Sequence, residues 1–257
     1  ELDRGLIDVA EPLLDEAGRI FAELEDPAGD VTVALPRAHA ARLRGQLDRA
    51  RAILRDGLAA TRELGYVGDE ARLLAESGSV ELDAGDPAAA ERAARASLAL
   101  VRSGVGERDS EHRALLVLAA AAIATGDRDG GRLSLEEAVA LGGTPPTSMW
   151  RQANAALAMC LAADDTRHGA EGRMGGQPGS AARAFDHAAL ASDGAEDSAG
   201  TWVAARRATA AALVAEGRLD EAATELRVAL ARFDGALAFL APVRKDLGHV
   251  TELGACS

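Results

Sequence analysis

The chain has 257 residues and a formal net charge of −13, with 48% hydrophobic but only 3% aromatic residues. Nucleic-acid-binding proteins carry a basic surface, so neither nucleic acid nor an anionic membrane surface is expected as a direct partner. The apolar residues are mostly Ala, Leu and Val, which favour close-packed helices over strands.

The sequence shows no sign of export or membrane insertion. No run of 18 or more apolar residues occurs, and the first 30 residues lack the basic and apolar regions of a signal peptide. The two cysteines, Cys160 and Cys256, do not make a disulfide framework. We therefore expect a cytoplasmic protein.

In chain order, apolar periodicity and the positions of Gly, Pro and Asp predict helices throughout. A solitary helix is predicted over 5–24, beginning or kinking at Pro12, and a loop over 25–30. Asp86 and Ser110 are predicted helix N-caps. Five helix pairs are predicted: 36–44 with a second helix from the turn at Gly45 to 64, 70–84 with 87–101, 110–125 with 128–141, 148–163 with 181–191, and 201–216 with 219–235. A last helix is predicted over 236–253, with a break at Pro242, and it is either a cap or the first helix of another repeat.

A repeated pattern organises these helices. In Gly217–Phe233 a Gly is followed by a small residue at +5, an apolar residue at +9 and a small residue at +12, and five other segments fit. The opening residues are Gly5, Gly45, Gly85, Gly126, Gly176 and Gly217, at intervals of 40, 40, 41, 50 and 41 residues. Such a period indicates a repeat array. The longer interval predicts an inserted flexible loop at 164–179.

This pattern resembles the tetratricopeptide repeat family. With each opening Gly at position 15 of the family's unit, small residues fall at positions 8, 20 and 27, where two antiparallel helices approach closely. They are Ala38, Gly78, Ala119 and Ala210; Ala50, Ala90, Gly131, Ala181 and Ala222; and Gly57, Ser97, Ala138, Ala188 and Ala229. The period exceeds that of the family, and its aromatic positions are mostly filled by Ala, Leu or Arg. The likeness is therefore to long-period variants, as in bacterial signalling and transcription regulators.

The resemblance implies an all-α, right-handed solenoid of tandem antiparallel helix pairs. We predict one domain over 1–257, with a partial repeat or cap at 1–30 and a C-terminal cap helix at 236–257. The helix-pair repeats are predicted at 31–64, 70–104, 110–142, 147–192 and 199–235. A generic α-solenoid with similar pairing is the alternative.

In this family the first helix of each pair lines a concave groove, at positions 2, 5, 9 and 12. The matching residues here are Arg72, Ala75, Ser79 and Leu82; Arg113, Leu116, Ala120 and Ile123; Asn154, Leu157, Leu161 and Asp164; and Ala204, Arg207, Ala211 and Val214. The first pair contributes His39 and Arg42. The resemblance thus implies a ligand-binding set of Arg72, Leu82, Arg113, Leu116, Ile123, Asn154, Leu157 and Arg207.

Arginines beside an apolar floor suggest a ligand type. Arg72, Arg113 and Arg207 can donate charge-assisted hydrogen bonds to carboxylates of an amphipathic peptide or helix in the groove. The alternative is that they are solvated side chains near helix starts.

Recognisable catalytic chemistry is not predicted. Residues 126–134 (GDRDGGRLS) lack the Lys that a phosphate loop needs before Ser or Thr. The five histidines show no metal-binding spacing, so no metal site is predicted. Asp164, Asp165 and His168 cluster with Arg167 in the predicted loop, where solvation is the expected role and metal binding or acid–base chemistry is the alternative. Cys160 is expected to be a buried packing residue, and Trp150 and Trp202 are expected to anchor the core.

We therefore expect a protein- or peptide-interaction scaffold without catalytic residues, cofactor or metal. It would be the partner- or ligand-sensing region of a larger bacterial regulatory protein, a step that rests on analogy. One alternative is a self-contained small-molecule sensor or enzyme with its site in the groove near 164–179. Another is a structural protein that stacks on itself.

Overall fold

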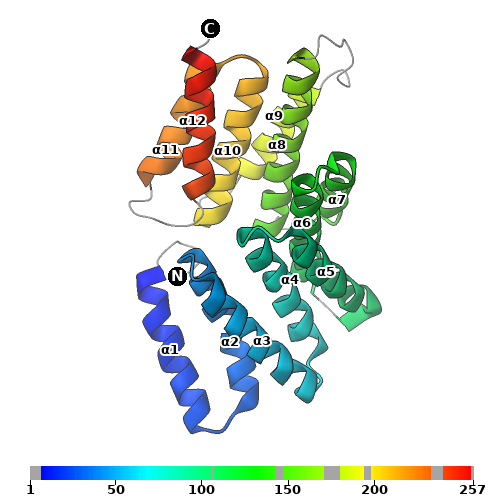
Figure 1. Ribbon diagram of the computed structural model, residues 1–257, viewed down its shortest axis with the longest axis vertical. Coiled ribbons are helices and arrows are strands. Elements are labelled where there is room, and N and C mark those ends of the chain that lie inside the picture. The colour runs from blue at the N-terminus through cyan, green and yellow to red at the C-terminus, as the bar shows by residue number, and fades with distance from the viewer. Residues whose placement is uncertain are drawn as a thin grey trace. The chain divides into compact units, whose positions relative to one another are not determined.

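The structure is a computed structural model that describes residues 7–105, 107–142, 147–170, 180–193, 198–232 and 240–255. Every regular element within these ranges is helical, and none of these residues lies in a strand (Figure 1). The all-α fold class is thereby confirmed. No helix in these ranges is both long and apolar enough to cross a membrane.

The described residues form two compact units, which comprise residues 7–141 and residues 142–255. We call them unit 1 and unit 2. Within each unit, helices that follow one another in the sequence pack against one another. These neighbour contacts are consistent with a helical repeat.

Unit 1 consists, in its described part, of a single helix, three helix pairs and a π-helical turn. They are α1 (Ile7–Glu23), α2 (Pro27–Leu43) with α3 (Leu47–Leu64), α4 (Val67–Asp83) with α5 (Pro87–Leu100), the turn η2 (Val101–Val105), and α6 (Arg108–Ala124) with α7 (Arg128–Ala140). The first helices of the pairs also contact one another, α2 with α4 and α4 with α6. They therefore form a row of their own.

Unit 2 continues the pattern with two pairs and a last helix. They are α8 (Ser148–Ala170) with α9 (Ser180–Ser192), α10 (Ala199–Ala215) with α11 (Leu219–Arg232), and α12 (Ala241–Ala255). The first helices α8 and α10 contact each other, and α12 contacts α11 and, less extensively, α10. Thus α12 packs on its neighbours as α6 packs on α5 and α4.

The start of α5 illustrates how the sequence begins these helices. Gly85 has a left-handed φ of 79°, a conformation that glycine adopts without steric cost. The carboxylate of Asp86 then accepts a hydrogen bond from the backbone N–H of Ala89 at 2.9 Å, and Pro87 is the first helical residue. The predicted N-cap is confirmed.

The predicted loop over 25–30 was wrong beyond Asp26, because α2 begins at Pro27. The Asp26 carboxylate accepts from the backbone N–H of Ala28 at 3.0 Å, as in the Asp-Pro start of α5. The preceding residue differs, since Glu25 and not a glycine takes the left-handed conformation, with a φ of 51°. Because no glycine marks this turn in the sequence, the helix was predicted to start at Pro36, which lies inside α2.

Other predicted boundaries also shift. Helix α1 begins at Ile7 and runs through Pro12. Helix α6 begins after Glu107, so Ser110 is not its N-cap but a buried residue within it. Pro242 lies in the first turn of α12 and does not break it. Residues 236–239 lie outside the described residues.

Helix α8 is longer than the sequence suggested. It was predicted to end at 163 but continues to Ala170. The first part of the predicted loop over 164–179 is therefore helical. The rest of that loop, 171–179, lies outside the described residues.

Small residues lie where helices approach most closely, as the repeat pattern predicted. A Cβ added to Gly78 of α4 would lie 2.8 Å from Cγ1 of Val117 in α6 and 3.2 Å from the carbonyl oxygen of Ala90 in α5. The described alanines at the equivalent positions are all buried: Ala38, Ala50, Ala90, Ala119, Ala138, Ala188, Ala210, Ala222 and Ala229. The helices pack at these sites with almost no side chain between them.

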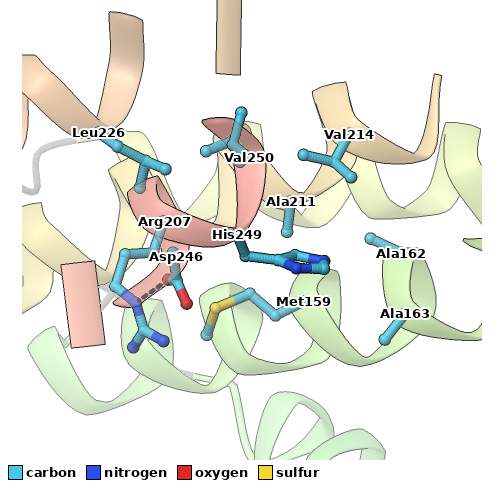
Figure 2. Close-up of a pocket in the computed structure, with 11 residues that line it drawn as sticks. Met159, Ala162, Ala163, Arg207, Ala211, Val214, Leu226, Asp246, His249 and Val250 are labelled. Atoms are coloured by element: carbon cyan, nitrogen blue, oxygen red, sulfur yellow. Dashed lines mark hydrogen bonds and ion pairs between the residues drawn. The ribbon is translucent and has the colours of Figure 1, made fainter. Parts of the chain in front are cut away.

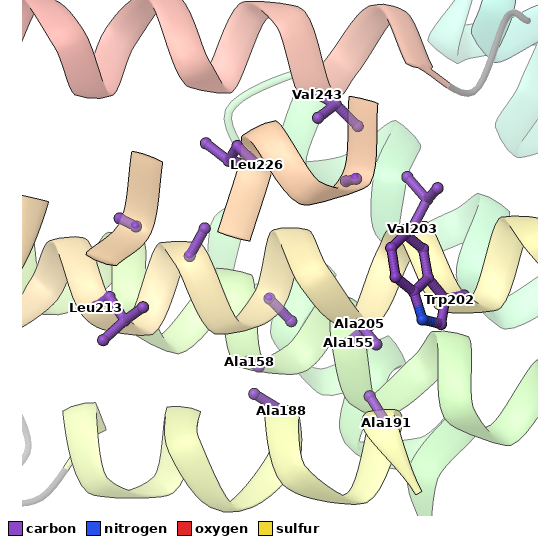
Figure 3. Packing of buried hydrophobic residues seen from close by; sticks show 14 of the residues in the cluster. Ala155, Ala158, Ala188, Ala191, Trp202, Val203, Ala205, Leu213, Leu226 and Val243 are labelled. Atoms are coloured by element: carbon purple, nitrogen blue, oxygen red, sulfur yellow. The ribbon is translucent and has the colours of Figure 1, made fainter. Parts of the chain in front are cut away.

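The core of unit 2 is built mainly from alanine with a few larger side chains (Figure 3). Trp202 of α10 is its largest member and is buried, as expected of a core anchor. The guanidinium groups of Arg206 and Arg232 lie 5.0 and 4.4 Å from the centre of its ring. Both distances are within the range of cation–π contacts, so the tryptophan also fixes two charged side chains at the edge of the core.

Candidate functional site

The first helices of unit 1 share a charged cluster around a fully buried carboxylate, Glu76 of α4. Its Oε1 accepts a hydrogen bond from Arg42 Nε at 2.8 Å and lies 3.0 Å from His39 Nδ1, both from α2. Its Oε2 accepts from Arg113 Nη1 of α6 at 2.6 Å. Arg42 also donates to Asp83 of α4 at 2.9 Å. The cluster therefore connects α2, α4 and α6.

Electrostatics keep Glu76 ionised in the folded chain. Burial alone raises the pKa of its carboxyl, but Arg42 and Arg113, and then His39, outweigh burial and hold the pKa well below the ordinary value of 4.5. Burial also opposes the charge of Arg42, yet Glu76 and Asp83 raise the pKa of that guanidinium. The charges of Glu76 and Arg42 thus depend on their partners.

A pH dependence of stability follows from Glu76. Above about pH 4.5 the carboxylate is ionised in both the folded and the unfolded chain, and its full contribution is present. Below that pH the unfolded chain takes up a proton that the folded chain does not, so the contribution is lost as the pH falls toward the folded-state pKa. The gap in free energy of unfolding between wild type and Glu76→Gln should shrink as the pH falls below about 4.5. Urea denaturation at a series of pH values measures this gap, and a gap that widens as the pH falls below about 4.5 would contradict the assignment.

Unit 2 contains a pocket of about 320 Å³ between α8, α10, α11 and α12 (Figure 2). Most of its lining is apolar: Met159, Ala162, Ala163, Ala210, Ala211, Val214, Leu226 and Val250. The small alanines of α8 and α10 leave room that larger side chains would fill. The volume is at the lower end of the range of about 300–1,000 Å³ that is typical of ligand pockets.

Polar groups lie at one side of this pocket. Arg207 Nε of α10 donates to Asp246 Oδ2 of α12 at 2.7 Å. His249 is exposed about one turn further along α12, and its imidazole reaches toward Met159 of α8 (Figure 2). The pocket thus combines an apolar floor with an ion pair and an imidazole, groups that can orient an amphipathic ligand.

Most of the predicted groove residues of α4, α6 and α10 do keep part of their surface exposed. They are Arg72, Ser79, Leu82, Arg113, Leu116, Ala120, Ile123, Ala204, Arg207, Ala211 and Val214, whereas Ala75 is buried. Arg207, Ala211 and Val214 come together in the pocket of unit 2. Arg113 belongs instead to the Glu76 cluster of unit 1.

The three predicted arginines already have carboxylate partners within the chain. The pairs are Arg72 with Asp69 (3.1 Å), Arg113 with Glu76 (2.6 Å) and Arg207 with Asp246 (2.7 Å). A ligand carboxylate at these positions would compete with an internal partner. The apolar lining, and not the arginines alone, must therefore supply much of the binding free energy at such a site.

The surface stripe of α8 lies one or two residues before the predicted one. Asn154, Leu157 and Leu161, predicted to line the groove, are buried, whereas Asp164, the fourth predicted residue, keeps part of its surface exposed. The Asn154 amide donates to the Trp150 carbonyl oxygen at 3.0 Å. The partly exposed stripe consists of Gln152, Ala156, Met159 and Ala163. The repeat that contains α8 is longer than its neighbours, and the prediction assigned all of its additional residues to a loop after residue 163. Some of these residues instead lengthen α8.

Sequence reasoning missed Glu76, Met159, Asp246 and His249. Glu76 carried a usable signal, because an acidic residue beside the small packing residues Ala75 and Gly78 is expected to need a buried partner. Met159 was missed because the groove positions predicted for α8 do not coincide with its exposed residues. Asp246 and His249 were missed because no groove positions were assigned to the last helix.

The segments considered for catalysis have other roles or lie outside the described part. In residues 126–134, the Asp127 carboxylate caps α7 by accepting from the Gly130 N–H at 2.9 Å. Cys160 is buried, as predicted. The side chains of Asp165 and His168 are outside the described residues. No group of three His, Cys, Asp or Glu side chains within the described ranges is placed to hold a metal ion.

Fold and site together define an all-helical protein whose helices pack in sequence order, with a charged cluster in unit 1 and an apolar pocket in unit 2. In comparisons with known proteins, no family model matches the chain and no curated protein matches it.

Proposed function

We propose that the chain is a non-catalytic interaction module whose first helices bind a short protein segment. The apolar pocket of unit 2 is the observation that carries this proposal, because hollows of this kind accept the anchor side chain of a partner. In the same proposal the helix pairs form a right-handed, tetratricopeptide-like solenoid. It serves as the sensing region of a larger cytoplasmic bacterial regulator. Its partner is a protein or a peptide, and not nucleic acid or a membrane.

The lining of the pocket suggests how such a segment binds. An amphipathic helix or peptide places one bulky apolar side chain between Met159 and Val214. An acidic side chain next to that anchor reaches Arg207 in competition with Asp246, or reaches His249 at the exposed side. The apolar anchor supplies affinity, and the charged groups set orientation and specificity.

Filling the pocket should abolish this recognition. Peptides selected from a display library on the intact chain provide the probe. Ala211→Phe puts an aromatic ring where the anchor would lie, so the dissociation constant of a selected peptide should rise at least about tenfold, which corresponds to about 1.4 kcal/mol. Ala189→Phe, at an exposed alanine of α9 outside the pocket, is the matched control and should bind like wild type. Isothermal titration measures both, and equal affinity of the two variants would refute the pocket as the anchor site.

A small-molecule sensor is the second candidate, because the pocket has the size of a ligand site. Its lining includes Ala162 and Ala163 of α8, which directly precede residues 164–179 in the sequence. A thermal-shift screen of metabolites, nucleotides and metal ions tests it. A compound that raises the melting temperature saturably in wild type but not in Ala211→Phe would favour the sensor. A screen without such a compound, together with peptide binding that Ala211→Phe abolishes, would favour the interaction module.

A further inference from the structure

Unit 1 contains a hollow of its own, which lies between the neighbouring helices α3 and α4. Its volume is about 400 Å³, within the range of about 300–1,000 Å³ that is typical of small-molecule sites. We call it the arginine hollow, and its charged lining residues are Asp48, Arg51, Arg55, Arg62 and Glu81. The chain as a whole has a formal net charge of −13, yet here arginines outnumber carboxylates. A local excess of positive charge favours an anionic ligand.

Two ion pairs join α3 to α4 at this hollow. Arg51 donates to both carboxylate oxygens of Glu81, from Nε at 2.9 Å and from Nη2 at 2.7 Å. Arg62 Nε donates to Glu70 Oε1 at 2.6 Å. The arginine hollow therefore has an ion pair between the helices near each of its ends. Because a peptide chain would have to pass over these pairs, the space fits a small molecule better.

Arg55 of α3 and Ser77 of α4 line the hollow between these two ion pairs. They lie at the same level of the antiparallel helices, since each is four residues from its helix's member of the first pair. The Arg55 side chain is 76% exposed, and its Nε donates to Asp56, which does not line the hollow. Exposed pairs of this kind contribute little to stability, so a ligand can replace Asp56. Arg55 is thus the arginine most accessible to a ligand, and the Ser77 hydroxyl is a further donor at its level.

The hydrogen-bond donors that remain in the hollow belong to two guanidinium groups. Both lining carboxylates, Asp48 and Glu81, already accept from Arg51. Arg55 and Arg62 use only Nε in their ion pairs, and within the described residues their terminal amino groups donate to no protein acceptor. The planar fork of a guanidinium matches the oxygens of a phosphate group, to which it can donate two parallel hydrogen bonds.

We propose that the arginine hollow binds a small phosphate monoester. Its phosphate group accepts hydrogen bonds from Arg55 and Arg62 of α3 and from the Ser77 hydroxyl of α4. Leu58 lies between the two arginines on the same face of α3, and the apolar part of the ligand packs against it. A doubly charged phosphate is attracted more strongly by two guanidinium groups than a singly charged anion of the same shape is.

Isothermal titration of the intact chain with phenyl phosphate tests this proposal. In a phosphate-free buffer at about pH 8 the probe carries two negative charges. Wild type should bind it saturably, with a dissociation constant of about 0.1–1 mM. Arg55→Gln should raise this constant at least about tenfold, because it removes the most accessible guanidinium and leaves both ion pairs between α3 and α4 in place. Wild type that does not bind the probe, or an Arg55→Gln variant that binds it equally well, overturns the proposal.

Arg95→Gln is the matched control, because it changes the net charge by the same amount. Arg95 is 70% exposed on α5, pairs with Glu91 and does not line the hollow. This variant should bind phenyl phosphate like wild type, and circular dichroism verifies that both variants are folded. Ala211→Phe should also bind it like wild type, since Ala211 lines the pocket of unit 2, so this test is independent of peptide recognition there. If Arg95→Gln weakened binding as much as Arg55→Gln, the probe would be attracted by charge in general and the site would be refuted.

Two further probes test the chemical class of the ligand. Phenyl sulfate has the shape of phenyl phosphate but a single charge, and it should bind at least about tenfold more weakly. Equal affinity for the two probes would contradict a phosphate site. A peptide with one phosphotyrosine between glycines carries the same phenyl phosphate group on a main chain. It should bind no more tightly than phenyl phosphate, and clearly tighter binding would show that a phosphorylated protein, and not a small molecule, is the ligand.

Discussion

Replacing Glu76 with glutamine is expected to lower the free energy of unfolding by about 3–5 kcal/mol at neutral pH, the usual cost of removing one partner from a buried ion pair. The amide has nearly the shape of the carboxylate but carries no charge. Arg42 and Arg113 would then lose the carboxylate that compensates their partial burial between α2, α4 and α6. Urea denaturation followed by far-UV circular dichroism measures the change. Hydrogen exchange should place the loss of protection in these three helices.

Glu91→Gln provides the matched control for this experiment. Glu91 pairs with Arg95 one turn further along α5, and both side chains are largely exposed. An exposed pair of this kind contributes at most about 0.5 kcal/mol. If Glu76→Gln proved as mild as Glu91→Gln, the cluster would not be the electrostatic link between the first helices that we describe.

Gly78→Leu is expected to destabilise the chain by about 3 kcal/mol, which is the upper part of the usual range for overpacking. A Cβ at residue 78 would lie 2.8 Å from the Val117 side chain and 3.2 Å from the Ala90 carbonyl oxygen, so α4 would have to move away from α5 and α6. The effect runs against helix propensity, because leucine by itself favours the helix over glycine by up to about 1 kcal/mol.

Gly248→Leu separates the two effects. Gly248 lies within α12, and a Cβ added there would meet no atom within 4 Å. Only helix propensity then acts, and the free energy of unfolding should rise by up to about 1 kcal/mol. Thermal or urea denaturation of both variants gives the comparison. If both substitutions changed stability in the same direction, the small residues would not be what allows the helices to approach.

The helix pairs could be predicted because their signals are local. The Gly85-Asp86-Pro87 turn, for example, specifies a left-handed residue, an N-cap and a first helical residue in consecutive positions. The start of α2 was not predicted, because Glu25 takes the left-handed conformation that glycine takes in the other turns. No sequence pattern indicates this exception.

The candidate site was predictable only as far as the repeat register holds. Ala211 and Val214 were placed correctly on the exposed side of α10, because α10 directly precedes Gly217, which follows Gly176 at the regular interval of 41 residues. In α8 the predicted groove positions were wrong, because the longer interval between the repeat glycines does not show whether the additional residues extend the helix or the loop. Pairs such as Arg113 with Glu76 link separate helices, so their geometry depends on packing that no local pattern encodes.

The pocket of unit 2 is the surface on which the proposed function depends most. Hydrogen–deuterium exchange of the intact chain, with and without a peptide selected from the display library, tests it most directly. Bound peptide should slow exchange in α8, α10 and α12 around Met159, Ala211 and His249, the residues that surround the pocket. Protection confined to α9, or to unit 1, would contradict the account.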